Sequence, residues 1–309
     1  MSPAPDRRLL PAATEVPFGD IESALASRGG PSRMQAGPRA LTATIVVIGP
    51  HERLFEAAEA LEQLADRAGV RTILISNGED PAPAAWLADH AVAIEGLKPQ
   101  FVNNAVAALR LSSLPTLVWW RGGEAGTLPA LSSLADRLVL DALDPQAGWQ
   151  QAATLFERTA LGDLRWTRLT RWRALMAHFF DIPEVRAAGS TFTHLEVSGS
   201  DTHMLRLFAG WLISALPLPA GAAIDLHQTK GPAGVERVRL SNGAGELLLR
   251  LASSGTCVET AAHVEGHAGA SRTVSLGSQS LDALIAEELR IRSRDLAFER
   301  ALVSARDVA

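Results

Sequence analysis

The sequence predicts an α/β fold in which an N-terminal Rossmann-like parallel sheet is followed by an α+β domain with an antiparallel sheet. Two observations indicate the first part. Residues 44–48 are an unbroken β-branched run, as in strands buried on both faces, and residues 52–68 then place apolar side chains at helical spacing. A third observation indicates the second part: beyond residue 192, short strand-like segments recur between turn residues.

The strand–helix alternation continues through the first domain. Further strands are expected at residues 70–76, 91–94, 116–120 and 137–140, and helices at residues 101–111 and 128–135. Such repeats form right-handed crossovers, which cover a parallel sheet on both faces. Ligands of these sheets bind beyond the carboxyl ends of the strands, so the residues that follow each strand are the candidates for a site.

The second domain mixes helices with strands that are expected to form an antiparallel meander. Helices are expected at residues 149–161, 164–180, 201–215, 280–292 and 295–305, and strands at residues 192–197, 223–229, 236–240, 246–251 and 258–262. Asn242 and Gly243 favour a hairpin turn, and Asp201 is a suitable N-cap for the helix that follows it.

These patterns divide the chain into three segments. Residues 1–39, which contain several prolines, are expected to be a mobile tail with one short helix at residues 20–27. Residues 40–146 are expected to form the Rossmann-like domain. Residues 147–309 are expected to form the α+β domain with the antiparallel meander and the closing helices.

Composition excludes several classes of protein. The 309 residues carry 29 Lys plus Arg and 34 Asp plus Glu, a formal net charge of −5, whereas nucleic-acid binders need a dense positive surface. No run reaches the roughly 18 apolar residues of a membrane span. The single cysteine, Cys257, excludes an intramolecular disulfide and a Cys-rich zinc site. We therefore expect a cytoplasmic protein that binds neither nucleic acid nor membrane.

The sequence lacks the usual signatures of cofactor binding and catalysis. The turn after the first strand, Gly49-Pro50-His51, has one of the three glycines that a dinucleotide fingerprint needs, and Pro50 removes an amide donor. No Walker sequence and no Gly-x-Ser-x-Gly elbow is present. We therefore expect no cofactor, no catalytic residue and no activity as an enzyme.

The strand ends nevertheless carry polar side chains that form a candidate ligand pocket. His51, Asn77, Arg121 and Asp141 each follow a predicted strand of the parallel sheet. If these side chains line an open pocket, the protein is an enzyme or sensor that binds an anionic metabolite. The other interpretation is that the protein binds no small ligand of its own.

A second candidate site lies on the predicted helix at residues 164–180. Trp166, Arg168, Trp172 and Arg173 combine the two residue types most enriched at binding hot spots, which favours an interface with a partner protein or the support directly behind one. The plainer alternative is a core-facing helix with a solvated basic face. A basic helix that binds nucleic acid fits less well, because the whole chain is acidic.

Histidines raise one further possibility. His263, Glu265 and His267 alternate and would share one face of a strand, where they could hold a metal ion. Their order does not match the helical His-Glu-x-x-His pattern of zinc proteases, so a strand end or polar loop is the better interpretation. We expect no metal site.

Three segments together resemble a known family. They are Leu-Pro-Thr-Leu-Val-Trp-Trp-Arg-Gly at residues 114–122, Leu-Ala-Asp-Arg-Leu-Val-Leu-Asp at residues 134–141, and Asp-Leu-Arg-Trp-Thr-Arg-Leu-Thr-Arg-Trp-Arg at residues 163–173. Their order and spacing are similar to those of the glucose-6-phosphate dehydrogenase assembly protein family, OpcA. The resemblance covers about residues 45–181.

The resemblance implies a partner and a role. Members of this family bind glucose-6-phosphate dehydrogenase, assist its oligomeric assembly and raise its activity at the entry to the oxidative pentose phosphate pathway. The resemblance therefore implies a non-catalytic assembly factor and allosteric activator. Thiol control, which is linked to some relatives, does not carry over as an internal disulfide switch, because Cys257 has no second cysteine to pair with.

Overall fold

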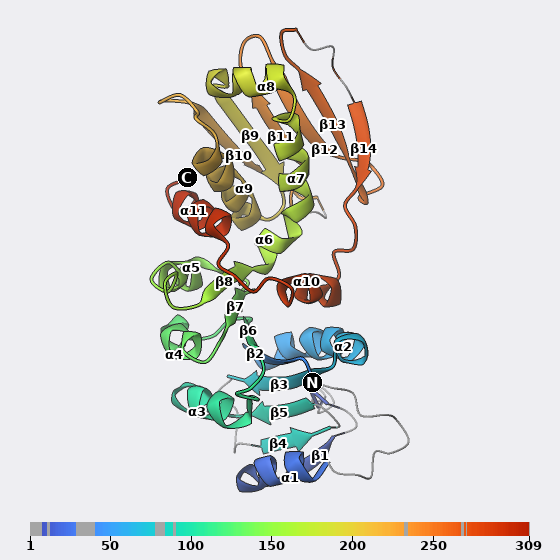
Figure 1. Cartoon of the computed structure of the whole chain (residues 1–309), viewed down its shortest axis with the longest axis vertical. Helices are drawn as coiled ribbons and strands as arrows, with labels where there is room; N and C mark the ends of the chain where they lie inside the picture. Colours follow the sequence, from blue (N-terminus) through green and yellow to red (C-terminus); the bar gives the residue numbers. More distant parts are fainter. Residues whose placement is uncertain are drawn as a thin grey trace, which may run out of the picture. The chain divides into compact units, whose positions relative to one another are not determined.

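Figure 1 shows the computed structural model of the chain, which describes residues 8–10, 13–28, 41–77, 84–88, 91–231, 234–266, 269 and 271–308. Contacts divide the chain into two compact units: unit 1 is Met1–Asp163 with Ser280–Arg294, and unit 2 is Leu164–Gln279 with Asp295–Ala309. The boundary expected after residue 146 falls inside unit 1. The segment at residues 280–294 belongs to unit 1, although it follows most of unit 2 in the sequence.

Unit 1 is built on a mostly parallel sheet, as predicted. Within the described residues its strands, in sheet order, are β1 (Thr14–Val16), β4 (Ala84–Leu87), β5 (Ala91–Glu95), β3 (Val70–Ser76), β2 (Ala43–Gly49), β6 (Thr116–Trp120), β7 (Arg137–Leu140) and β8 (Ala160–Asp163). The strands from β5 to β8 in this order are parallel, and β1 and β4 extend the sheet in antiparallel pairing.

Helices cover both faces of this sheet, which is why its central strands are mostly apolar. The helices are α1 (Ile21–Arg28), α2 (His51–Ala68), α3 (Pro99–Leu109), α4 (Leu128–Ser132), α5 (Gln146–Ala152) and α10 (Leu281–Glu288), with short 3-10 turns η1 (Phe18–Asp20) and η3 (Ala125–Thr127). Figure 1 shows α2 and α10 along one face and α3, α4 and α5 along the other. All seven residues of β2 are buried, as expected for a strand between two helical layers.

Several elements of unit 1 differ from expectation, among them β4, which was not expected. Thr14–Val16, which we expected to lie in a mobile tail, is an edge strand paired with β4. The helix expected at residues 149–161 is wrong: α5 ends at Ala152, and Ala160–Asp163 is strand β8, paired with β7. Apolar residues in this segment mimic helical spacing, but pairing with the buried edge of β7 overrides that local preference.

Unit 2 contains a mostly antiparallel sheet, which confirms the predicted fold class. In sheet order its strands are β10 (Ala223–Gln228), β9 (His194–Gly199), β11 (Arg237–Ser241), β12 (Glu246–Leu251), β13 (Cys257–His263) and β14 (Ser271–Ser275). A simple antiparallel meander is not what forms, because β10 pairs parallel to β9 at the edge of the sheet. Helix α9 (Thr202–Ala215) connects these two strands, and a helical crossover of this kind joins parallel neighbours.

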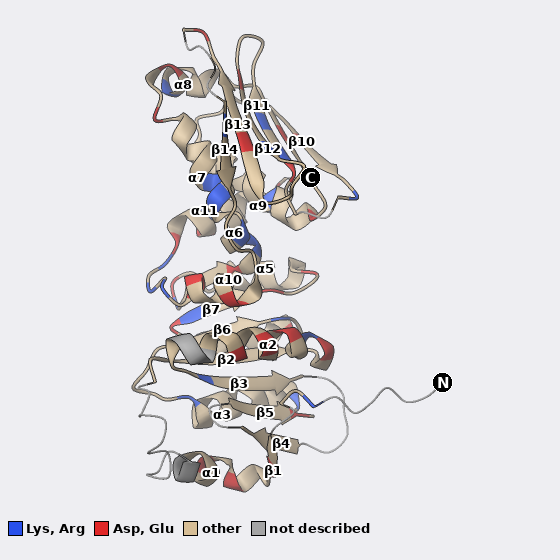
Figure 2. Cartoon of the chain, turned by 90° about the vertical axis from the view of Figure 1, so that its right-hand side faces the viewer, with Lys and Arg blue, Asp and Glu red and all other residues tan. Residues whose placement is uncertain are grey.

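The helices of unit 2 pack against one face of this sheet. They are α6 (Leu164–Arg168), α7 (Thr170–Phe179), α8 (Pro183–Ala188), α9 and α11 (Leu296–Ala305), with the 3-10 turn η4 (Gly189–Thr191). The helix expected at residues 164–180 is interrupted at Leu169, whose N–H bonds both Arg165 and Trp166 carbonyls. Asp201 caps α9, as predicted, by accepting from the N–H groups of His203 and Met204. Figure 2 shows the basic residues of α6 and α7 in blue.

Helices α9 and α11 cross at very close range because α9 has a glycine at the contact. A Cβ on Gly210 would lie 2.5 Å from the carbonyl oxygen of Ala301 and 2.6 Å from the nitrogen of Ala305, both backbone atoms of α11.

Within the described part of the chain, no helix combines the length and apolar character that a bilayer span requires.

We therefore predict that Gly210→Ala destabilises the protein by about 1–3 kcal/mol, because the added methyl forces two backbones apart in a packed core. Urea unfolding followed by tryptophan fluorescence measures the change. Gly243→Ala is the matched control: nothing lies within 4 Å of its Cβ position, and the expected change is within about 0.5 kcal/mol. Equal stabilities for the two variants would contradict this account of the helix crossing.

Candidate functional site

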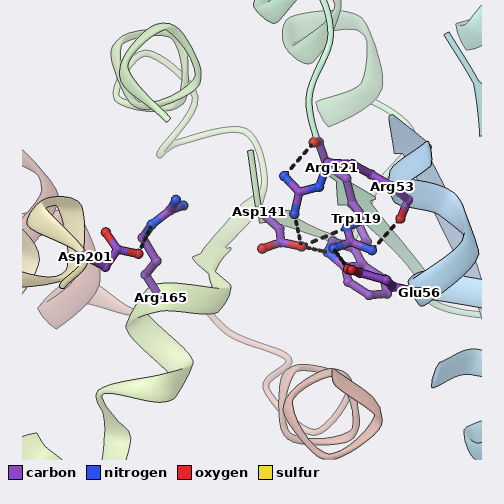
Figure 3. Close-up of polar contacts among 7 residues, drawn as sticks. All are labelled: Arg53, Glu56, Trp119, Arg121, Asp141, Arg165 and Asp201. Atoms are coloured by element: carbon purple, nitrogen blue, oxygen red, sulfur yellow. Dashed lines mark hydrogen bonds and ion pairs between the residues drawn. The ribbon is translucent and has the colours of Figure 1, made fainter. Parts of the chain in front are cut away.

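Four residues predicted to form a pocket lie at the carboxyl edge of the parallel sheet in unit 1. His51 follows β2, Asn77 follows β3, Arg121 follows β6 and Asp141 follows β7. The structure brings two of them into direct contact and gives the other two different partners. Figure 3 shows the contacts around Arg121 and Asp141.

Arg121 is buried, with 2% of its surface exposed, and all three of its guanidinium nitrogens have partners. Nε donates to Asp141 Oδ2 at 2.9 Å, Nη1 donates to the Arg53 carbonyl oxygen at 2.6 Å, and Nη2 contacts Glu56 Oε2 at 3.1 Å. The guanidinium also lies 4.9 Å from the ring centre of Trp119. A buried charge costs stability unless it is paired, and these contacts supply the pairing from within the chain.

Asp141 collects three donors on the same side of the site. Its Oδ2 accepts from Arg121 Nε, from Trp119 Nε1 at 3.2 Å and from Arg53 Nη2 at 3.5 Å. Arg53 and Glu56 were not predicted from the sequence. The only available signal is their place in the first turns of α2, the helix that starts directly after β2 at this edge.

Asn77 and His51 are held by other groups. Asn77 Nδ2 donates to the Gly122 carbonyl oxygen at 2.9 Å. It packs so closely that a Cβ on Gly123, whose φ is +112°, would overlap the amide nitrogen. His51 Nδ1 lies 3.9 Å from Glu95 Oε1, and its ring meets Phe55 edge-on. The predicted four-residue cluster therefore divides into the Arg121–Asp141 network, the Asn77–Gly122 contact and the His51–Glu95 pair.

This arrangement occupies the place where related sheets receive a ligand. A phosphate group is usually held there by free backbone amides at the start of a helix and by vacant basic side chains. Here Pro50 removes one amide, and the Arg121 guanidinium is already paired on every nitrogen. Whether an anionic metabolite binds at this edge stays a prediction.

The second candidate segment lies in unit 2 and is more buried than a surface site requires. Trp166 and Trp172 have 2% and 3% of their surface exposed. Trp166 Nε1 donates to Asp295 Oδ2 at 2.8 Å, and the ring packs against Phe298 of α11. Both indoles are therefore part of the interior of unit 2. Buried indoles can support a protein–protein interface from behind, but only the more exposed arginines can contact a partner directly.

Of the arginines of this segment, Arg173 lies over that interior. The Arg173 guanidinium stacks 3.5 Å from the ring centre of Trp166, and its Nη2 donates to Thr170 Oγ1 at 3.3 Å. Arg168 is half-buried. Arg165 pairs with Asp201 at 3.0 Å, as Figure 3 shows. Stacking on an indole fixes a guanidinium plane in one orientation, which suits bidentate recognition of a carboxylate.

The metal site weighed for the histidines is not supported by the part of the chain that the structure describes. His267 lies outside the described residues, and His263 is exposed at the end of β13. Among the described residues, no group of three or more His, Cys, Asp or Glu side chains is arranged to hold a metal ion.

The fold defines a class: proteins with a Rossmann-like first unit and a second unit built on a mostly antiparallel sheet. A super-repressor mutant of Gal80p from Saccharomyces cerevisiae has a similar fold, with a TM-score of 0.50 and 9% sequence identity over 86% of this chain and 94% of that chain. Aldose-aldose oxidoreductase from Caulobacter crescentus gives a TM-score of 0.47 and 12% identity over 86% and 95% of the two chains.

Sequence comparison matches part of the chain to known proteins. Residues 159–302 match the family described as the C-terminal domain of the glucose-6-phosphate dehydrogenase subunit. The putative OxPP cycle protein OpcA of Synechocystis sp. is 31% identical over 125 residues, which cover 37% of this chain and 26% of that protein. The match thus spans about a quarter of the relative's length. These findings support the resemblance to the OpcA family, and the family match itself is limited to residues 159–302.

If the Arg121 network is structural, removing its central carboxylate must cost stability. We predict that Asp141→Asn, which keeps the side-chain size, destabilises the protein by about 3–5 kcal/mol, because the buried guanidinium loses the less exposed of its two carboxylate partners and keeps only the exposed Glu56. Urea unfolding measures this. Glu259→Gln is the matched control, because its pair with Arg250 is exposed, with 62% of the Arg250 side chain and 38% of the Glu259 side chain accessible. That change should cost at most about 1 kcal/mol; similar losses in both variants would refute the structural role.

Proposed function

We propose that this protein is a non-catalytic assembly factor that binds glucose-6-phosphate dehydrogenase, promotes its oligomeric assembly and raises its activity in the oxidative pentose phosphate pathway. The family match over residues 159–302, described as a domain of a subunit of that dehydrogenase, carries the proposal. The relative from Synechocystis, which is named as a protein of the OxPP cycle, supports the same pathway.

The carboxyl edge of the parallel sheet supports a role without chemistry. The turn after β2 has a single glycine followed by Pro50. The Arg121 guanidinium already pairs with groups of the same chain. A dehydrogenase of this architecture would need that edge open for a dinucleotide. We therefore assign no cofactor, no catalytic residue and no turnover to this protein.

Activation by binding has a thermodynamic requirement. The protein must bind the active conformation of the dehydrogenase more tightly than the inactive one, since an effector shifts an equilibrium only through its differential affinity. A coupling free energy of about 1–3 kcal/mol is sufficient for a change of about five- to 150-fold in substrate affinity.

Arg168 and Arg173 form the proposed contact surface. Arg168 and Arg173 lie on α6 and α7, and Trp166 and Trp172 form the rigid support behind them. Guanidinium groups held in place lose little entropy on binding, so each ion pair with a carboxylate of the partner contributes more. Acidic side chains on the dehydrogenase are the expected counterpart.

We predict that mixing the full chain with the dehydrogenase from the same organism enlarges its oligomer and lowers its KM for glucose 6-phosphate. Replacing Arg168 and Arg173 together by Ala should weaken binding at least about tenfold, because two positioned cations are lost from the contact surface. Sedimentation velocity and steady-state kinetics measure the two effects.

Two controls keep this experiment decisive. Arg300→Ala removes one exposed arginine from α11 and should leave binding and activation unchanged. Melting curves establish that the double variant is folded, because Arg173 also stacks on Trp166. Full binding by the folded double variant would disprove the assignment of the surface. Turnover of a small molecule by the protein alone, with no effect on the dehydrogenase, would disprove the function.

A further inference from the structure

The amino edge of the parallel sheet in unit 1 contains a polar cleft that no part of the proposed function uses. We call it the α10 cleft. It encloses about 120 Å³ between the first residues of β2, β6 and β7 and the end of α10. The residues used below are Thr116, Asp136, Arg137, Glu288 and Arg292.

A buried guanidinium with vacant donors is the central feature of this cleft. Arg137 is 4% exposed, and its Nε pairs with Glu288, which is 1% exposed. Its Nη1 and Nη2 have no hydrogen-bond partner, and neither does the buried hydroxyl of Thr116. Arg121 at the opposite edge of the same sheet has a partner on each guanidinium nitrogen. Buried donors without an acceptor cost free energy, so two unpaired Nη groups on one guanidinium indicate that an acceptor from outside the chain binds there.

The geometry of the vacancy indicates the kind of acceptor. Glu288 accepts the hydrogen bond from Nε of Arg137. The two Nη groups, side by side at the end of the guanidinium plane, are left without a partner. This fork matches two oxygens of one carboxylate or phosphate group. The sheet holds the fork in place, because Arg137 is the first residue of β7 and a Cβ at Gly162 on β8 would lie 2.7 Å from Nη2.

The other charges of the cleft decide how strongly an anion is held. Exposed Arg292 adds a second cation at the rim. Exposed Asp136 opposes it, although its Oδ2 accepts the N–H of Thr116 at 2.8 Å. The Arg137–Glu288 pair is neutral overall. Binding therefore depends on the directed Nη donors, and the two rim charges adjust it in opposite directions.

The cleft is large enough for such a group and for part of the molecule that carries it. Its volume of about 120 Å³ exceeds the roughly 30 Å³ share of a water molecule. A second cleft of about 360 Å³ adjoins it and shares Ala43, Leu289 and Arg292 with it. We propose that the α10 cleft binds an oxyanion, a phosphate or carboxylate group, in a bidentate contact with the two Nη groups of Arg137.

Calorimetry of the full chain with inorganic phosphate, and separately with malonate, tests the proposal and distinguishes the two sources of the oxyanion. Chloride at matched ionic strength is the blank. Arg292→Ala should weaken binding by about fivefold and Asp136→Asn should strengthen it by about fivefold, because each changes one rim charge near the anion. Arg300→Ala, which changes the charge of the protein equally but lies on α11 in unit 2, should change nothing.

The Arg137 fork itself needs a variant that folds. Arg137→Met alone leaves Glu288 buried and unpaired, whereas Arg137→Met with Glu288→Leu replaces the buried ion pair by apolar side chains of similar volume, a change that proteins tolerate well. This double variant should melt near the wild-type temperature and lose binding. No heat with either anion, unchanged affinity in Arg292→Ala, or binding retained by the double variant would each overturn the proposal.

Discussion

The pairing of Arg121 is the constraint on which the carboxyl edge of unit 1 depends. A guanidinium that is 2% exposed must find its acceptors within the protein, and it draws them from β7 and from the first turns of α2. The neighbouring backbone adapts to it: a Cβ at Gly49 would lie 2.9 Å from the Arg121 Cβ. The glycine at the end of β2, which resembles the start of a phosphate-binding turn, therefore serves the packing of an arginine.

Three buried indoles of the chain donate to aspartates. Trp119, Trp149 and Trp166 each donate Nε1 to an aspartate, namely Asp141, Asp163 and Asp295. An unpaired buried indole N–H costs about 1–3 kcal/mol, so each of these three aspartates stabilises the fold, whereas the buried Nε1 of Trp120 has no hydrogen-bond partner. Four of these six residues lie in the segments that carry the family resemblance, so those motifs help to stabilise the fold.

Local pattern predicted much of the fold but little of what depends on distant partners. The run at residues 44–48 and the helix after it are correct because burial on both faces leaves a local signature. Strand β8 and the parallel pairing of β10 were missed, since each depends on a neighbouring strand. The site shows the same division: Arg121 and Asp141 were identified by their positions after strands, whereas Arg53 and Glu56 become partners only through the packing of α2.

The two edges of the parallel sheet treat a buried arginine differently. At the carboxyl edge an arginine is paired on every guanidinium nitrogen, and at the amino edge Arg137 is paired only on Nε. The difference arises from chain connectivity, because α10 returns to unit 1 after the whole of the antiparallel sheet and brings Glu288 to Arg137 across 151 residues. Beyond Arg292 the chain runs directly to Asp295, which caps α11 and accepts from Trp166. The short segment that carries Arg292, the rim cation of the α10 cleft, is therefore also the segment that leads into the cap of α11.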